Sequence, residues 1–422
     1  MTTNLTQYYQ AQKKRIIETC SACGKCVLVC PIIEHTHLRD SSPQAIQRAL
    51  LDYLAGGEMT DMVHTRIYAC MACFRCSVDT CPLGLDPMLM IEIARWEAAQ
   101  RQTQKNKTAE EEKVRSQKVL ASIQVPATDL ERLFRPPEKT TADVVFFPGC
   151  NVYNQPEKVL SALDIMQTIG EDWLYLPGVD NCCGDSAIFD SDIQKAGRLS
   201  ESLINKLKAF QAKTVVLWCP TCKCRFDAYY EQIHDLPFMV LSFPQYVVQH
   251  FDKLTVQGTL FSTQVTLHEA CKSAYLNNDL NGIRELINKL PGYELVEMPR
   301  HGKETACCGS GAVVHYKDSF NQMRRERLTE AMQTGACAMV DVCHYCHQTF
   351  NGVQPEIDVV NYISLLTESM GIARPDKLKH FLNLGDVNLI MEEAKPYLKT
   401  SPYSEDMIRE AVKALLDESL EK

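Results

Sequence analysis

Long apolar runs are missing from this 422-residue sequence, and no stretch approaches the ~18 consecutive apolar residues of a membrane span. The segment from Met1 to Arg15 is polar and lacks the apolar core of a secretory signal. We therefore expect a cytoplasmic protein that reaches a membrane only through a partner. A GxGxxG fingerprint between a strand and a helix is also missing. Any flavin or nucleotide is thus expected on a partner subunit and not on this chain.

An excess of positive charge is missing as well. The chain carries 44 Lys and Arg against 53 Asp and Glu, which gives a formal charge of −9. Nucleic-acid binding needs a basic face, so we expect no nucleic-acid partner. The hydrophobic share of 45% and the charged share of 23% are ordinary for globular domains.

Cysteine, by contrast, is abundant, with 20 residues. In a secreted protein they would indicate disulfides, but without a secretory signal metal ligation is the better interpretation. Two of them, Cys224 and Cys337, fall outside every pattern described below and are expected to be buried thiols. The other cysteines form two runs of four and two sets of five.

The first eight cysteines form two ferredoxin-type runs, each ending in Cys-Pro. A zinc site also uses CxxC pairs, but zinc needs only four ligands and gains nothing from a further CxxC spacing followed by Cys-Pro. In two-cluster ferredoxins the fourth Cys of one run ligates the other cluster. This crossed pattern predicts two cubane [4Fe–4S] clusters, one held by Cys20, Cys23, Cys26 and Cys81 and one held by Cys70, Cys73, Cys76 and Cys30.

A long internal repeat occupies the middle of the chain. Equivalent cysteines of its two copies are 121, 125 and 124 positions apart. Strand-like runs alternate with helical stretches, which predicts two similar α/β units whose cysteines lie at the C-terminal ends of strands. The apolar runs are 144–147, 174–177, 215–218, 265–268, 295–299 and 339–342, and the helical stretches are 157–169, 192–210, 283–290 and 318–332.

Each copy of the repeat supplies five cysteines in the order Cys, Cys-Cys-Gly, CxxC. The gaps are 31 and 35 residues in the first copy, and 35 and 34 in the second. A cubane cluster needs only four thiolates. A vicinal disulfide suits a reducing cytosol poorly, and a zinc ribbon uses two CxxC pairs where each copy has one.

This five-cysteine pattern resembles the CCG domain that the catalytic subunits of methanogen heterodisulfide reductases carry twice. The N-terminal eight-cysteine region resembles the small ferredoxin-like subunit of the same enzyme, so residues 15 to 365 resemble a fusion of the two. The resemblance implies an α/β and α+β multidomain fold, with a helical two-cluster ferredoxin-like domain before two α/β CCG domains. It also implies two non-cubane [4Fe–4S] clusters, held by Cys150, Cys182, Cys183, Cys219 and Cys222, and by Cys271, Cys307, Cys308, Cys343 and Cys346.

In function, the resemblance implies an iron–sulfur oxidoreductase of heterodisulfide-reductase type. Electrons would pass from the ferredoxin-type clusters to the non-cubane clusters, which cleave a disulfide in two one-electron steps. Chain order puts the first copy next to the ferredoxin-like region, so we expect the second five-cysteine set to be the catalytic one. Lys272 stands where many relatives have a His proton donor and is included with that set. Five histidines could replace that donor: His268, His301, His315, His344 and His347.

A non-catalytic electron conduit is the alternative. The chain would then be the iron–sulfur subunit of a flavoprotein dehydrogenase for lactate, glycolate or glycerol 3-phosphate. It could equally serve a large anaerobic complex, electron-bifurcating or reducing acyl-CoA or benzoyl-CoA. Either interpretation implies a flavin-containing partner, with a membrane cytochrome or a ferredoxin as further candidates.

Five segments are expected along the chain. A charged helical linker, with Thr108 and Glu111 as a capping box, is expected to be exposed. The tail is expected to pack on the chain's own core through Ile408, Val412, Leu415 and Leu416. The segments are the ferredoxin-like domain (1–105), the linker (106–141), the first CCG domain (142–255), the second CCG domain (256–365) and the helical tail (366–422).

Overall fold

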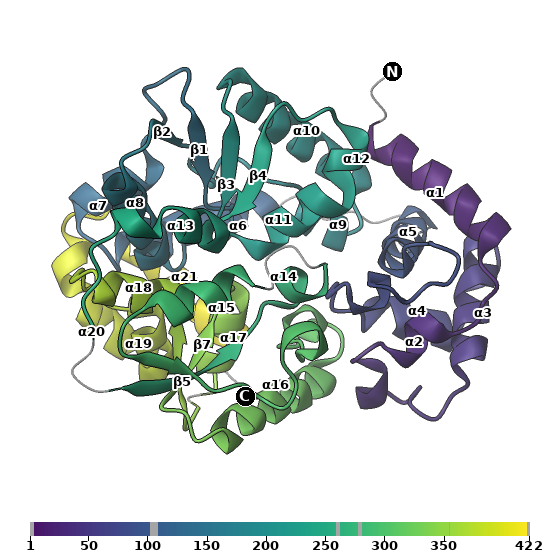
Figure 1. Ribbon diagram of the computed structural model, residues 1–422. Coiled ribbons are helices and arrows are strands. Elements are labelled where there is room, and N and C mark those ends of the chain that lie inside the picture. Colours follow the sequence, from purple (N-terminus) through teal and green to yellow (C-terminus); the bar gives the residue numbers. More distant parts are fainter. Residues whose placement is uncertain (1–3, 102–108, 259–261, 277–280, 354, 420–422) are drawn as a thin grey trace.

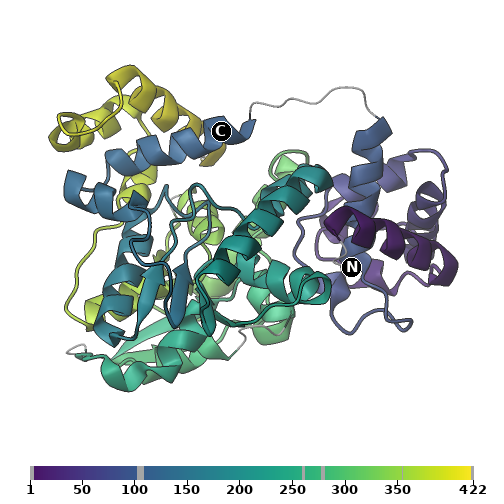
Figure 2. The same ribbon diagram turned by 90° about the horizontal axis from the view of Figure 1, so that it is seen from above.

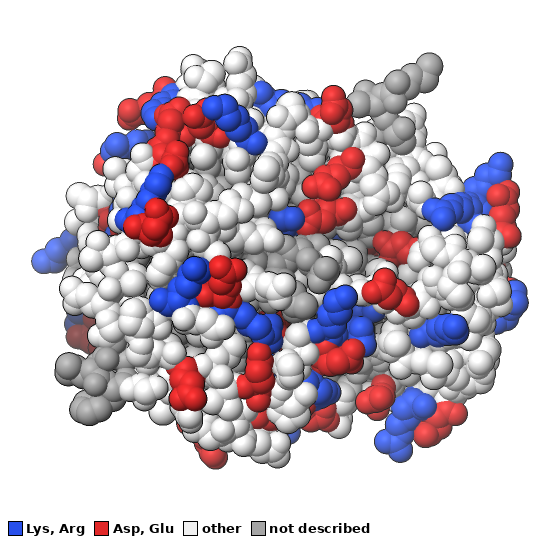
Figure 3. All heavy atoms as spheres, in the orientation of Figure 1, with Lys and Arg blue, Asp and Glu red and all other residues white. Residues whose placement is uncertain are grey.

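The computed structural model describes residues 4–101, 109–258, 262–276, 281–353 and 355–419 (Figure 1). A helical N-terminal domain lies beside two parallel sheets that are each covered by helices, so the expected multidomain α/β architecture is confirmed. No helix in the described ranges is long and apolar enough to cross a membrane. On the face shown in Figure 3, acidic and basic side chains are interspersed.

The N-terminal domain is helical, and its two cysteine-rich loops connect the helices. Asn4 begins the first helix with a capping box, in which its side chain accepts from the Gln7 N–H and Gln7 reaches back to the Asn4 N–H. The elements are α1 (Leu5–Thr19), α2 (Lys25–Leu28), η1 (Ile33–His35), α3 (Pro43–Leu54), α4 (Asp61–Tyr68), η2 (Arg75–Ser77) and α5 (Pro87–Arg101).

The first sheet has the order β2-β1-β3-β4 and is parallel throughout. Its strand β1 is buried at all four residues, as expected for a parallel sheet covered on both faces. The strands are β1 (Val144–Phe147), β2 (Trp173–Tyr175), β3 (Thr214–Leu217) and β4 (Met239–Ser242). The helices are α8 (Pro156–Ile169), α9 (Asp185–Phe189), α10 (Ile193–Ala209), α11 (Pro220–Arg225), the π-helical turn η3 (Phe226–Tyr230), α12 (Glu231–Ile233), α13 (Phe243–Gln249) and η4 (Phe251–Lys253).

The second sheet repeats this arrangement with the order β6-β5-β7-β8, again parallel. The strands are β5 (Thr263–His268), β6 (Tyr293–Leu295), β7 (Ala338–Asp341) and β8 (Asp358–Asn361). The helices are α14 (Cys271–Tyr275), α15 (Gly282–Lys289), η5 (Gly302–Glu304), η6 (Ser310–Ala312), α16 (Lys317–Gln333), α17 (His344–Asn351) and α18 (Tyr362–Ser369).

The helical tail packs against the helix that was expected to be an exposed linker. Figure 2 shows α6 (Ala109–Ser122) running beside the C-terminal helices. Val119 and Leu120 of α6 are buried in one cluster with Ile408 and Val412, so the expectation of an exposed helix is wrong for its last turns, whereas the tail packs as predicted. Thr108 of the expected capping box lies outside the described residues. The remaining helices are α7 (Ala127–Phe134), α19 (Lys377–Leu384), α20 (Val387–Leu398) and α21 (Glu405–Ser419).

Candidate iron–sulfur centres

The ferredoxin-type loops carry local features that suit thiolate ligands. Ala22 and Ala72 both adopt a left-handed conformation with φ of 52°. Their backbone N–H groups donate to Cys20 Sγ at 3.5 Å and to Cys70 Sγ at 3.4 Å. Such bonds stabilise a sulfur that carries negative charge. The two loops therefore present their cysteines in the same local geometry.

Cys30 lies with the second run of cysteines. Its charge acts on Cys70, Cys73 and Cys76, and burial, the largest cause, raises the pKa of all three thiols. Cys26, in the first run, is affected by Cys20, Cys23 and Cys30, and burial raises its pKa to about 11. Such thiols lose their protons at neutral pH when a metal takes the proton's place. Cys20, Cys23 and Cys81 are only partly buried.

A buried arginine lies between the two ferredoxin-type groups. The Arg66 side chain on α4 is 1% exposed, and its Nη1 donates to Cys30 Sγ at 3.1 Å. Burial alone would lower the pKa of Arg66, but thiolate charges, with that of Cys30 the largest, raise it above its ordinary value. Its Nε and Nη2 are buried and have no oxygen, nitrogen or sulfur partner in the described chain. A buried cation with spare donors fits an anionic iron–sulfur cluster, so this donor set suits the expected group.

The two five-cysteine sets have the same geometry in both repeats. In the first set, Cys150 and Cys182 have their Sγ atoms 3.4 Å apart, as do Cys183 and Cys222. In the second set, the Sγ distance is 3.8 Å for Cys271 and Cys307, and 3.4 Å for Cys308 and Cys346. The two neighbouring cysteines of each Cys-Cys pair thus approach different partner cysteines. The fifth members, Cys219 and Cys343, lie just after the central strands β3 and β7.

The glycine after each cysteine pair has a conformational reason. Gly184 and Gly309 have φ of 88° and 85°, a region that favours glycine. In this conformation the Gly184 N–H donates to Cys182 Sγ at 3.3 Å, and the Gly309 N–H donates to Cys307 Sγ at 3.5 Å. The Cys-Cys-Gly motif is therefore a tight turn that points both thiols inward and directs one backbone N–H at a sulfur.

Several cysteines of these sets favour the thiolate form. Hydrogen bonds from Cys307 and Cys346 lower the pKa of Cys308 well below its ordinary value, and His268 adds to the effect. A hydrogen bond from Cys346, followed by one from His344, lowers the pKa of Cys343 well below its ordinary value. Hydrogen bonding with Cys271 and with Cys308 instead raises the pKa of Cys307 and of Cys346, respectively, well above the ordinary value. The five converging thiols form a soft, all-sulfur donor set, which suits iron–sulfur chemistry.

The second set lies beside the ferredoxin-type group of Cys73. The charge of Cys271 acts on Cys73, and the Tyr275 ring lies close to both. The backbone of Met71 packs so tightly on Gly311 that a Cβ atom at Gly311 would lie 2.7 Å from the Met71 oxygen. Chain order had suggested that the first repeat adjoins the N-terminal domain, but it is the second five-cysteine set that lies beside Cys73.

The two five-cysteine sets also adjoin each other. The charge of Cys343 acts on Cys219, and His344 interacts with both thiols. Helix α11 packs on α14, and the Trp218 and His344 rings are 6.0 Å apart. The four cysteine groups therefore form one continuous series through the molecule.

Lys272 lies in a buried ion-pair network that joins all three domains. Its Nζ is 3.2 Å from Asp185 Oδ1, and the Arg225 Nε donates to the same oxygen at 2.5 Å. Arg225 Nη1 in turn donates to Glu92 Oε1 on α5 at 2.8 Å. Burial alone would raise the pKa of Asp185, but Lys272 and Arg225 lower it to about 2. Burial opposes the charge of Lys272, but Asp185 raises its pKa above the ordinary value, so the side chain stays cationic.

Most of the candidate histidines are enclosed. His268, His344 and His347 are at most 1% exposed. His347 lies between Asp341 at 2.7 Å and Asp376 at 2.6 Å. His301 is half-exposed beside Glu297, and the His315 ring packs on Tyr68 with burial lowering its pKa. Of the two cysteines outside the motifs, Cys224 is fully buried as expected, whereas Cys337 is exposed, so the prediction of a buried thiol is wrong there.

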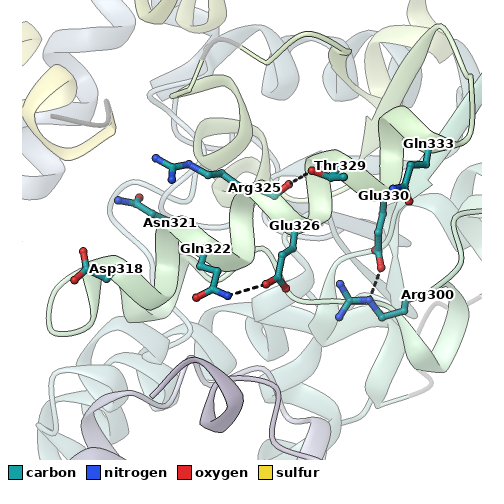
Figure 4. Close-up of a pocket in the computed structure, with 9 residues that line it drawn as sticks. All are labelled: Arg300, Asp318, Asn321, Gln322, Arg325, Glu326, Thr329, Glu330 and Gln333. Atoms are coloured by element: carbon teal, nitrogen blue, oxygen red, sulfur yellow. Dashed lines mark hydrogen bonds and ion pairs between the residues drawn. The ribbon is translucent and has the colours of Figure 1, made fainter. Parts of the chain in front are cut away.

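A hollow of about 770 Å³ lies elsewhere, along α16 (Figure 4). Its lining is polar and charged and includes no cysteine. Arg300 and Glu330 form an ion pair across it, and Gln322 donates a hydrogen bond to Glu326 along the helix. This hollow is separate from the cysteine groups and offers no soft ligand.

Comparison with known proteins gives the same division of the chain. The profile of a 4Fe-4S dicluster domain matches residues 16–85, and that of a cysteine-rich domain, CCG, matches residues 144–227 and 265–351. One subunit of the dihydromethanophenazine:CoB–CoM heterodisulfide reductase of Methanosarcina barkeri is 25% identical over 55% of this chain and 60% of its own length. The chain thus spans less than two thirds of that relative.

Two further relatives cover different parts. A fumarate reductase (CoM/CoB) of Methanothermobacter marburgensis has a subunit that is 24% identical over 80% of this chain and 68% of its own length. Lactate utilization protein A of Macrococcus caseolyticus is 23% identical over 50% of this chain and 88% of its own length. The chain is thus similar to proteins named for more than one activity.

Proposed function

Because the chain belongs to the heterodisulfide reductase family of iron–sulfur proteins, with a dicluster domain before two CCG domains, we propose that it passes electrons from two cubane clusters to two non-cubane clusters that reduce a disulfide. At the coarser level it is an iron–sulfur electron-transfer protein of that family. The observation that carries the finer proposal is the position of Cys271 beside Cys73, with Cys343 beside Cys219. Electrons can thus move between neighbouring cysteine groups without leaving the chain.

The proposed ligands are those of the crossed ferredoxin pattern and of the two five-cysteine sets, and the charge of Cys30 on Cys70, Cys73 and Cys76 supports its place with the second run. Cys30 would complete the group of Cys70, Cys73 and Cys76, and Cys81 would complete that of Cys20, Cys23 and Cys26. Each CCG set would hold its cluster through five thiolates. When bound, these clusters supply single electrons at potentials that the protein tunes. Arg66 would offset the cluster charge between the two cubane sites.

The reaction takes two electrons, delivered singly by a flavin or ferredoxin on a partner, and two protons from solvent. The S–S bond breaks and two thiols form. The chain's own part is to hold the sites in series and to keep them away from water, since the CCG cysteines are largely buried. Lys272, next to Cys271 of the second set, would hold that set beside the first through its ion pair with Asp185. Its charge is already engaged in this ion pair.

A direct assay separates this proposal from the conduit alternative. The chain is reduced anaerobically with a one-electron dye and then mixed with a mixed disulfide, with Cys183→Ala and Cys308→Ala variants in parallel. We expect thiol release from the parent and its loss in Cys308→Ala. Electron transfer to a flavoprotein partner without any thiol release would favour the conduit. Because electrons reach the first set past the second, turnover retained in Cys183→Ala would assign the disulfide to the second set, whereas loss of turnover in both variants would assign it to the first set.

Iron content tests the number of clusters. We expect about 16 iron atoms per anaerobically isolated chain, four for each of four [4Fe–4S] clusters. Metal and sulfide analysis provides the measurement. About eight irons accompanied by zinc would contradict iron–sulfur clusters at the CCG sets.

Packing at Gly311 tests the path between the domains. The variant Gly311→Ala places a methyl group 2.7 Å from backbone atoms of Met71, so we expect the interface to lose about 1–3 kcal/mol. Reduction of the CCG centres from the dicluster side should slow, as followed by stopped-flow spectroscopy. Gly197→Ala is the matched control, because its new methyl group would meet Leu5 at an ordinary 3.5 Å. Equal rates in both variants would contradict transfer across the Met71 contact.

A further inference from the structure

The two CCG repeats differ at one buried position of their central strands. Phe147 ends β1 and His268 ends β5, each three residues before the first cysteine of its set. Phe147 pairs in register with Leu217, and His268 pairs with Asp341, at the same place in each sheet. Both side chains are 0% exposed. A polar ring thus replaces an apolar ring in an enclosed position.

A second difference accompanies the first. The helices α10 and α16 begin 124 residues apart, at Ile193 and Lys317, and this offset matches Leu203 to Arg327. Leu203 is 1% exposed, and the Arg327 side chain is 0% exposed. The first repeat therefore has an apolar Phe–Leu pair where the second has a His–Arg pair. Burying two polar groups costs free energy unless each is hydrogen-bonded, so the pair calls for a function.

Arg327 fixes the protonation of the His268 ring. Its Nε–H donates to His268 Nδ1 at 3.0 Å. A guanidinium has no acceptor, so Nδ1 must carry the lone pair and Nε2 the proton. The guanidinium is itself held by Thr305 Oγ1 at 3.1 Å and by Glu330 at 2.7 Å. The Phe350 ring packs edge-on against the imidazole with centroids 4.7 Å apart, which fixes its plane.

The remaining ring nitrogen is available to the cysteine site. His268 Nε2 is buried and has no hydrogen-bond partner among the described residues. A ring nitrogen of His268 and the Sγ atoms of Cys308 and Cys346 all lie within 4.8 Å of one another. The ring thus offers a spare N–H donor beside two sulfurs of the second set.

The hydrogen bond from Arg327 distinguishes a donor from a ligand. A histidine that binds metal uses one lone pair and donates its other N–H to an acceptor. At His268 the second nitrogen faces a donor instead, which leaves no lone pair at Nε2 in the neutral ring. The geometry therefore favours an N–H···S hydrogen bond over coordination.

We propose that His268 donates its Nε2–H to a sulfur of the cluster at the second CCG set, and that Arg327 is the positioning residue that holds it in this tautomer. Hydrogen bonds to cluster sulfurs stabilise the more negative, reduced state. The second CCG site is then more easily reduced than the first, whose equivalent position is Phe147. Electrons that arrive through the ferredoxin-type group of Cys73 would be retained at the second CCG site, which lies beside that group. This inference rests on the proposed occupancy of the second set by an iron–sulfur cluster.

The test compares the parent chain with three variants. His268→Phe introduces the residue of the first repeat, and His268→Gln keeps a side-chain donor. The double variant His268→Phe/Arg327→Leu introduces the Phe–Leu pair of the first repeat. It avoids leaving Arg327 buried beside a phenyl ring that cannot accept its hydrogen bond. An electron paramagnetic resonance titration follows the reduction of the CCG centres, and electron–nuclear double resonance in H₂O and D₂O detects exchangeable protons near the cluster.

We expect His268→Phe and the double variant to keep their iron and to lose one exchangeable-proton coupling. The equilibrium for reducing that centre relative to the other should become roughly tenfold less favourable, as for loss of a hydrogen bond to a charged group. His268→Gln should lie between these variants and the parent. Unchanged coupling and unchanged reduction in the double variant would overturn the inference. Loss of iron in His268→Phe would also overturn it, because it would indicate that His268 is a cluster ligand. Absence of any CCG cluster from the parent would instead contradict the proposed function.

Discussion

Replacing Arg225 with Met is expected to destabilise the chain by about 3–5 kcal/mol, the usual cost of removing one partner from a buried ion pair. Arg225 is 1% exposed, and Glu92, its partner on α5, is 2% exposed. Without the guanidinium, the Glu92 carboxylate keeps, among the described residues, the hydroxyl donors of Tyr9 and Tyr229, at 2.7 and 2.8 Å. Asp185 keeps its ion pair with Lys272. The lost stability therefore concerns the contact between the dicluster domain and the first CCG domain.

Anaerobic denaturant unfolding with hydrogen exchange measures this effect. We expect amides of α1 and α5 to exchange faster in Arg225→Met, because their carboxylate anchor is lost. Arg225→Lys is the control, since it keeps the charge but cannot donate to Glu92 and Asp185 through one planar group. The double variant Arg225→Met/Glu92→Gln removes the unpaired carboxylate and should recover part of the loss. A change below about 1 kcal/mol in Arg225→Met, far short of the cost of breaking a buried pair, would mean that the network does not hold the domains together.

The central strands of both sheets could be predicted, and the edge strands β2 and β6 overlap expected apolar runs, whereas the edge strands β4 and β8 were not predicted. The apolar run at 144–147 forms β1, and the run at 265–268 forms the end of β5, which begins two residues earlier at Thr263. Strands β4 and β8 both lie at a sheet edge, where Met239 is 60% exposed and Asp358 is also exposed. A short strand at the edge of a sheet has little hydrophobic pattern to reveal it.

The spatial order of the cysteine groups could not be predicted from chain order. The first repeat follows the dicluster domain in sequence, yet Cys271 of the second repeat lies beside Cys73. The reason is the docking surface: Gly311 has no side chain and lets the Met71 backbone approach. A glycine that serves such a contact looks like any other loop glycine in one sequence.

Buried arginines were the functional residues that sequence reasoning missed. Arg66, Arg225 and Arg327 each lie in or beside a helix and would be taken for solvent-exposed charges. Their roles depend on partners 36, 133 and 59 residues away, namely Cys30, Glu92 and His268. The alignment of the two repeats offered one signal, since it sets His268 against Phe147 and Arg327 against Leu203.

Loss of a ferredoxin-type cluster is expected to have the largest structural effect. In Cys23→Ser the chain should lose about four of its irons, one cluster's worth, and the dicluster domain should lose much of its protection from hydrogen exchange. The helices of this domain are joined through its cysteine loops, so metal binding supplies a large part of its folding free energy, about 10 kcal/mol or more by analogy with structural zinc. Removal of metal also leaves Arg66 with buried, unpaired donors.

The two sheets should withstand the same change. Strands β1 and β7 are buried at every residue, and the strands paired with them contain no ferredoxin-type cysteine. We therefore expect the CCG signals in electron paramagnetic resonance and the slow exchange of both sheets to persist in Cys23→Ser, while reduction from the dicluster side is lost. Cys337→Ser is the matched control, because Cys337 is exposed and outside every motif, and it should change neither iron content nor exchange. If Cys23→Ser also erased the CCG signals, the four centres would form a single folding unit, and the docked dicluster domain would be required for the CCG sites to assemble.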